Sequence, residues 1–114
     1  PRDWIFTRSQ EHTQSLRVRS YLEQSTWEEA HLDAAACALH VTPRTLIRRL
    51  EADGTSFQAI KDALRRDIAI RRLQVGDASI EAIAQDVGYS SAASFHKAFH
   101  RWTGATPSSY RRRL

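Results

Sequence analysis

The fold of this chain is decided by residues 83–104, which read IAQDVGYSSAASFHKAFHRWTG. A short helical pattern leads into a tight turn around Gly88, and a longer helical pattern then runs over residues 91–102. One stripe of the longer helix carries three aromatic residues, Phe95, Phe99 and Trp102. Gly104 ends it, as glycine ends many helices. The stretch therefore predicts a helix-turn-helix unit whose second helix buries an aromatic stripe.

An earlier part of the chain repeats this pattern, with Ala36, Leu39, Val41, Thr42, Leu46 and Leu50 in the places of Ala84, Val87, Tyr89, Ser90, Phe95 and Phe99. The second copy carries one extra residue at its turn. A continuous helical pattern at residues 57–74 joins the copies, and no segment alternates apolar and polar residues as a strand would. The sequence predicts an all-α fold of two helix-turn-helix lobes joined by a long linking helix.

Capping residues and glycines set the expected helix bounds. Helix starts are marked by Ser56, Ser79, Thr42-Pro43 and Thr106-Pro107, because serine and threonine cap a helix and proline suits its first position. About seven helices are predicted, at residues 12–24, 32–39, 43–52, 57–74, 80–86, 91–102 and 107–112. Thr26 and Glu29 also fit a capping box, which leaves open a start near residue 27 for the second helix.

Each second helix pairs a buried stripe with a polar surface. In the first lobe, Leu46 and Leu50 lie on one side of the helix. Arg44 and Arg48 lie one turn apart on the opposite side, with Ile47 at the edge. Arginine can make two hydrogen bonds to a guanine edge, and isoleucine can touch a thymine methyl group. An ordinary solvated basic surface is the alternative interpretation, because exposed arginines are common.

The second lobe repeats this design. Its polar surface carries Lys97 and Arg101, with Ala93 between them and Ser94, His96 and His100 near the edges. The small residues at the start of this helix allow a close approach to a partner. Recurrence of one design in two lobes favours nucleic-acid binding over coincidence.

The composition agrees with a basic binding module. The 114 residues hold 17 Lys+Arg against 13 Asp+Glu, a net charge of +4, and this excess favours a polyanion as partner. No apolar segment is long enough to span a membrane, and no signal peptide is visible, so we expect no membrane partner. The sequence shows no nucleophile–base pair, phosphate-binding glycine loop or paired carboxylates, so we expect neither enzyme activity nor a cofactor.

The lone cysteine and two histidines carry weaker signals. Cys37 cannot form an intrachain disulfide, which favours a reducing cytoplasm, and its alanine-rich surroundings predict a buried side chain. His96 and His100 have the spacing of two metal ligands on one helix. Lys97, however, stands where a zincin motif has glutamate, and no third ligand is near, so no metal site is expected.

Residues 16–110 resemble the C-terminal DNA-binding domain of the AraC/XylS family of bacterial transcription regulators. The resemblance lies in VTPRTLIRRL at 41–50, GTSF at 54–57, Arg65, Ala69, Leu73, IA at 83–84, GYS at 88–90, SFHKAF at 94–99, RWTG at 101–104 and PSSYR at 107–111. It implies a DNA-binding domain at residues 12–114. The first helix-turn-helix is expected at about 32–52, the linking helix at 57–74 and the second helix-turn-helix at 80–102, with residues 1–11 as a linker remnant.

The resemblance also implies sequence-specific binding of double-stranded DNA, with two recognition helices in successive major-groove segments. By family position, base contacts fall on Arg44, Ile47, Arg48, Ala92, Ala93, Ser94, His96 and Lys97. Contacts to the DNA backbone are expected at Thr42, Thr45, Ser90, Ser91 and Arg101. In two departures from the family pattern, His31 stands where a capping Ser or Thr is usual, and Ala92 and Ala93 replace positions that are often polar.

The same residues bear on other possible partners and functions. For a transcription regulator, RNA polymerase is a further expected partner, and the family places a sensing or dimerising domain on the N-terminal side. The helices account for nearly every residue after His12, so no ligand cavity is expected here. An RNA-binding protein is disfavoured, because the aromatic residues fall on core stripes. A protein-interaction module would need an exposed apolar stripe, which we find only at residues 4–6.

Overall fold

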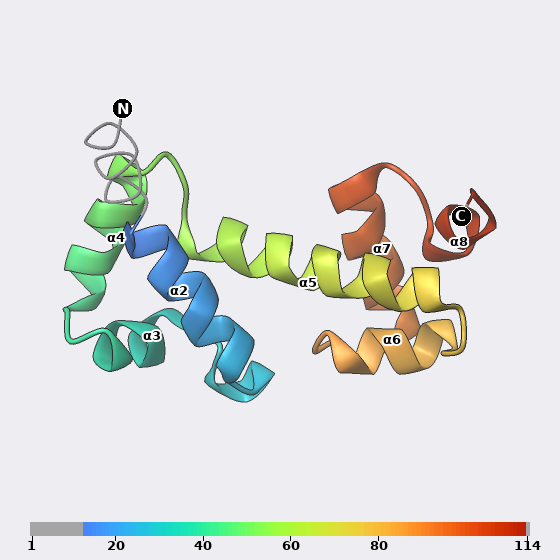
Figure 1. Ribbon diagram of the computed structural model, residues 1–114, viewed down its shortest axis with the longest axis horizontal. Helices are drawn as coiled ribbons and strands as arrows, with labels where there is room; N and C mark the ends of the chain where they lie inside the picture. The colour runs from blue at the N-terminus through green and yellow to red at the C-terminus, as the bar shows by residue number, and fades with distance from the viewer. Residues whose placement is uncertain (1–12, 114) are drawn as a thin grey trace, which may run out of the picture. The chain divides into compact units, whose positions relative to one another are not determined.

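The computed structural model describes residues 13–113, and these form helices and turns with no strand among them. In chain order the elements are α2 (Thr13–Gln24), the 3-10 helix η1 (Trp27–Glu29), α3 (Leu32–Ala38), α4 (Pro43–Ala52), α5 (Phe57–Val75), α6 (Ile80–Asp86), α7 (Ala92–Thr103) and α8 (Pro107–Arg113) (Figure 1). The all-α prediction is confirmed, and each predicted helix bound lies within one residue of the observed one. The expected linker remnant at residues 1–11 lies outside the described residues.

The chain divides into two compact units, Pro1–Lys61 and Asp62–Leu114, with the boundary inside α5. In the first unit, α2, α3 and α4 contact one another. Their shared core consists of Val18, Leu22, Ala35, Ala36, Leu46 and Leu50. Leu46 and Leu50 are the predicted buried stripe of α4, so the apolar side of that helix faces its own unit.

The second unit is built around aromatic rings. Its buried core comes from α5, α6 and α7 and from Val87, the C-cap residue of α6, and consists of Ala69, Leu73, Ile83, Ala84, Val87, Phe95 and Phe99. The ring centroids of Phe95 and Phe99 are 5.7 Å apart, and Tyr110 from α8 meets Phe99 edge-on at 5.5 Å. Such pairs add packing energy beyond the burial of their area. The aromatic stripe of α7 is therefore core, as predicted.

The helix caps form as the sequence predicts. The side-chain oxygens of Thr42, Ser56, Ser79 and Thr106 each accept a hydrogen bond at 3.1 Å from the backbone N–H three residues later. His31 also caps its helix, because its Nδ1 accepts from Ala34 N at 3.3 Å. The α-helix therefore starts at Leu32 despite the missing Ser or Thr. Thr26 makes no side-chain cap and is followed only by η1, so the alternative start near residue 27 is wrong.

The two helix-turn-helix turns share one backbone arrangement. The N–H of Val41 donates to Ala36 O at 3.0 Å, and that of Tyr89 donates to Ala84 O at 2.9 Å. The preceding residues, His40 and Gly88, have φ of 61° and 87°. His40 is thus in the left-handed region that favours glycine, and it is the only non-glycine residue there in the described part of the chain.

One detail of the predicted repeat is corrected by the second turn. Thr42 was aligned with Ser90, but the cap of α7 is Ser91, whose Oγ accepts from Ser94 N at 3.2 Å. Ser90 is therefore the inserted residue, and Thr42 corresponds to Ser91. This alignment also keeps Leu46 and Phe95 at the same distance from their caps.

The prediction of a buried Cys37 is wrong, because the residue is exposed. Ala35 and Ala36 take the buried positions of α3. The next residue is turned about 100° further around the helix and leaves the core. No helix within residues 13–113 has the length and apolar character needed to cross a membrane.

Candidate nucleic-acid interface

The exposed surface of α4 brings together the three predicted base-contact residues of the first unit. Arg44 and Arg48 are exposed, and Ile47 keeps 43% of its surface accessible although it is a large apolar residue. Neither arginine has a hydrogen bond or ion pair with another described residue. The neighbouring Arg49 differs, because its Nη1 donates to Gln14 Oε1 on α2 at 3.2 Å.

The predicted backbone-contact residues of the first unit serve as the cap of α4. Thr42 Oγ1 accepts from the N–H of Thr45, and the two hydroxyl oxygens are 2.9 Å apart. Thr42 is exposed and Thr45 is half-buried. The cap fixes the start of α4, where free N–H groups and the helix dipole favour an anion. Contact of Thr42 and Thr45 with a DNA backbone stays a prediction.

Like α4, α7 has an exposed polar surface opposite its buried side, but the side chains on that surface are of other types. Ala93, Ser94, Lys97 and Arg101 are exposed, as are Ser90 and Ser91 at the turn. His96 and Ala92 are half-buried. Lys97 and Arg101 make no hydrogen bond or ion pair with any residue in the described range. The predicted contact residues within α7 therefore lie on the side of the helix opposite its aromatic core, and Ser90 and Ser91 precede them in the turn.

One further residue of this surface, His100, is not in the predicted contact set. His100 is exposed, and it follows Ala93 and Lys97 at the i, i+4, i+7 spacing of one helix face. The signal was the same stripe that identified Lys97. His96 and His100 gain no third partner, since no group of three metal-ligating residues occurs between residues 13 and 113.

Charge is distributed unevenly between the two units. The sequence from 13 to 61 has six Lys or Arg and six Asp or Glu, whereas the sequence from 62 to 113 has nine against five. Of the six basic residues between positions 13 and 61, three lie on α4, at Arg44, Arg48 and Arg49. Attraction of a polyanion to this unit is therefore local to α4, because the unit as a whole is neutral.

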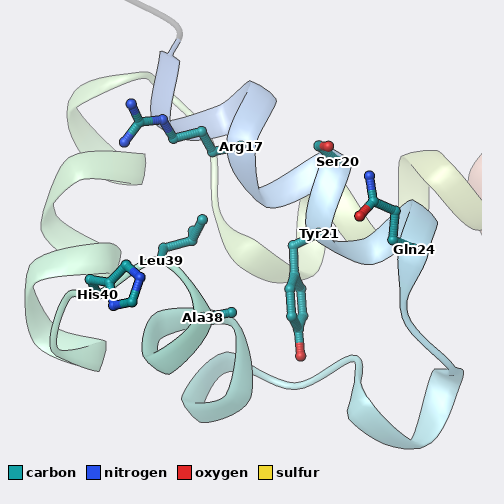
Figure 2. A pocket seen from close by; sticks show the side chains of 7 residues that line it. All are labelled: Arg17, Ser20, Tyr21, Gln24, Ala38, Leu39 and His40. Atoms are coloured by element: carbon teal, nitrogen blue, oxygen red, sulfur yellow. The ribbon is translucent and has the colours of Figure 1, made fainter.

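An open cleft of about 390 Å³ lies on the first unit, and no residue of α4 lines it. It is lined by Arg17, Ser20, Tyr21 and Gln24 from α2 and by Ala38, Leu39 and His40 at the end of α3 (Figure 2). Figure 2 shows Tyr21 extending toward the segment before α3, where its hydroxyl donates to Glu29 O at 2.9 Å. No ligand cavity is expected from the sequence, and this open surface cleft is lined by none of the predicted contact residues.

Comparison with known proteins identifies the family. Residues 35–113 match the family model described as "Helix-turn-helix domain". The chain belongs to the AraC-type helix-turn-helix family. The AraC-type domain is 35% identical over 95 residues to the ornithine utilization regulator of Pseudomonas aeruginosa, covering 83% of this chain and 28% of that protein. It is 30% identical over 107 residues to the urease operon transcriptional activator of Escherichia coli, covering 94% of this chain and 36% of that protein.

Solved structures agree with this assignment. A DNA-binding transcriptional dual regulator from Escherichia coli K-12 superposes with a TM-score of 0.82 at 26% identity, covering 88% of this chain and 90% of that one. The C-terminal domain of AraT, a response regulator from Geobacillus stearothermophilus, gives 0.78 at 29% identity, covering 89% and 85%. The predicted resemblance to AraC-type DNA-binding domains is confirmed. The chain spans about a third or less of the length of the two curated relatives named above.

Proposed function

We propose that this AraC-type domain binds double-stranded DNA by sequence, as the reading part of a transcription regulator, with α4 and α7 each in a segment of the major groove. The observation that carries the proposal is the design shared by the two helices. Each has a capped start, a fully buried stripe toward its own unit, and an exposed surface with basic side chains that have no partner among the described residues. Such a helix can enter the groove without giving up contacts of its own fold.

The exposed side chains of α4 and α7 suit different bases, according to their chemistry. Arg44 and Arg48 suit guanine edges, because the guanidinium fork can donate two parallel hydrogen bonds. The exposed Ile47 suits a thymine methyl group, and Lys97 suits a guanine edge in the segment read by α7. Ala93 and Ser94 are small and exposed, so the start of α7 can lie close to the bases.

Phosphate contacts complete the proposed interface. Ser90, Ser91 and Arg101 in the second unit, and Thr42 with Thr45 in the first, are assigned to the DNA backbone. Such contacts set register and supply affinity without reading sequence. The basic excess of residues 62–113 supports this assignment.

The relatives' names extend the proposal to the whole protein. Several are transcriptional regulators or activators, so regulation of transcription in the cytoplasm, with RNA polymerase as a second partner, is the role we propose for the protein that contains this domain. No catalytic step is part of it. The N-terminal sensing domain implied by the resemblance stays a prediction.

Selection from a random duplex library tests the function directly. We expect the recovered duplexes to bind roughly 10³-fold or more tightly than random duplex at physiological salt, as specific sites do. Single-stranded DNA and an RNA hairpin of equal length are the controls. Equal affinity for RNA, or recovery of no common sequence, would overturn the proposal.

A further inference from the structure

Arg65 and Tyr89 form a contact between α5 and the turn that precedes α7. Arg65 Nη1 donates a hydrogen bond to Tyr89 Oη at 3.2 Å, and the guanidinium carbon lies 4.8 Å from the centroid of the tyrosine ring. Both residues belong to the second unit. One arginine therefore holds the tyrosine by its hydroxyl and by its ring face.

The other contacts of Tyr89 fix it within the core of the second unit. Its ring centroid lies 6.0 Å from that of Phe95 and 6.0 Å from that of Trp102. Its N–H donates to Ala84 O at 2.9 Å. Arg65 thus links α5 to a side chain that is already packed against α7.

The described residues of the first unit, 13–61, contain no counterpart of this contact. Val41 occupies the place of Tyr89, and it has the matching backbone hydrogen bond but no ring or hydroxyl for an arginine to hold. Thr42 caps α4 directly after Val41, whereas Ser90 is inserted between Tyr89 and the cap of α7. The longer turn has more backbone freedom to lose, so it gains more from a side-chain anchor.

We propose that Arg65, acting through Tyr89, is a positioning residue that sets where the first turn of α7 lies for DNA reading. This inference rests on the proposed function. The chain leads from Tyr89 through Ser90 to the Ser91 cap, and the predicted contact residues follow at once. Groups that read a partner must be held within a fraction of an ångström. Loss of the contact between Arg65 and Tyr89 should therefore reduce base selectivity at a point where the fold itself is still stable.

Three substitutions separate positioning from packing. Tyr89→Phe keeps the ring and removes the hydroxyl that accepts the hydrogen bond. Arg65→Met keeps an apolar stem and removes the cation, whereas Arg65→Lys keeps a cation that can lie over the ring. We expect Tyr89→Phe and Arg65→Met to lose about 3- to 10-fold of base selectivity in the half-site read by α7. Arg65→Lys should restore part of it.

The assay is a base-by-base selectivity profile on duplexes selected by the wild-type domain. Arg48→Ala and Lys97→Ala, profiled in parallel, show which positions each helix reads. The positioning role requires a loss confined to the α7 half, with unchanged random-duplex affinity and an unchanged thermal midpoint for Tyr89→Phe. A uniform loss in both halves with a lower midpoint, or no loss at all, would overturn it. A wild-type domain without any base preference would instead overturn the proposed function on which it rests.

Discussion

Arg48→Ala and Arg49→Ala form a matched pair that tests how α4 reads DNA. Both arginines are exposed, they are adjacent on one helix, and each substitution removes one positive charge. Only Arg48 shares the surface of Arg44 and Ile47, because adjacent residues point about 100° apart on a helix. Arg49 is already engaged with Gln14 of α2. The pair therefore separates base contact from general attraction to phosphate.

We expect Arg48→Ala to cost about 1–3 kcal/mol on the best duplex, the value of one bidentate contact to a base. That corresponds to roughly 5- to 150-fold in Kd, with relaxed preference at one base pair. Arg49→Ala should weaken selected and random duplexes by the same small factor, because it loses only screened attraction to phosphate.

Fluorescence anisotropy on both duplexes at one fixed salt concentration measures these effects. The fold stability of both variants, followed by urea unfolding, should stay within about 1 kcal/mol of wild type, because surface changes of this kind are mild. If Arg49→Ala reduces selectivity as much as Arg48→Ala, or if Arg48→Ala keeps full selectivity, the assignment of the reading surface on α4 is wrong.

Two further predictions concern stability. Phe99→Ala should lower the free energy of unfolding by about 3–5 kcal/mol, because Phe99 is 0% exposed and packs against three other rings. Urea unfolding measures this loss, with Ile47→Ala at a half-exposed position as the control, which should stay within about 0.5 kcal/mol of wild type. Equal losses in the two variants would contradict the assigned core. His40→Gly should raise the free energy of unfolding by about 0.5–1 kcal/mol, and Gly88→Ala should lower it by a similar amount. A residue with a side chain pays about 1–2 kcal/mol to adopt the left-handed conformation, and the greater freedom of glycine in the unfolded chain offsets part of that difference. A less stable His40→Gly, seen in the thermal midpoint, would mean that the imidazole makes contacts worth more than the strain.

Most of the fold could be predicted from the sequence because its decisive signals are local. The Thr42 cap and the Pro43 that follows act within one helical turn, and the hydrogen bond that they predict is present at 3.1 Å. Gly104 likewise ends α7 with φ of 78°. The buried stripes follow from helical periodicity alone. Each of these features depends on residues three or four positions apart, so no knowledge of the distant chain was needed.

The features that sequence reasoning missed depend on contacts or geometry that it does not display. The left-handed turn at His40 was hidden because the residue is not glycine, and only comparison with Gly88 shows that the two turns are alike. The hydrogen bond between Arg65 and Tyr89 joins residues 24 positions apart. The exposure of Cys37 depends on how α3 is rotated against its neighbours, and an alanine-rich helix offers weak evidence for that rotation.

The two units have the same backbone arrangement but expose different side chains. This difference bears on how the proposed reading of DNA sequence is divided between α4 and α7. On α4 the exposed surface carries two guanidinium groups and an apolar side chain, which together can distinguish guanine and thymine by direct contact. The first turn of α7 carries small, uncharged side chains at Ala93 and Ser94. These side chains cannot reach far to hydrogen-bond a base, but they allow the helix backbone to lie close to the bases. We therefore expect selectivity there to depend more on the position of the helix than on the side chains it carries. That dependence gives a physical reason for the longer turn before α7 to be held by Arg65 while the turn before α4 is not.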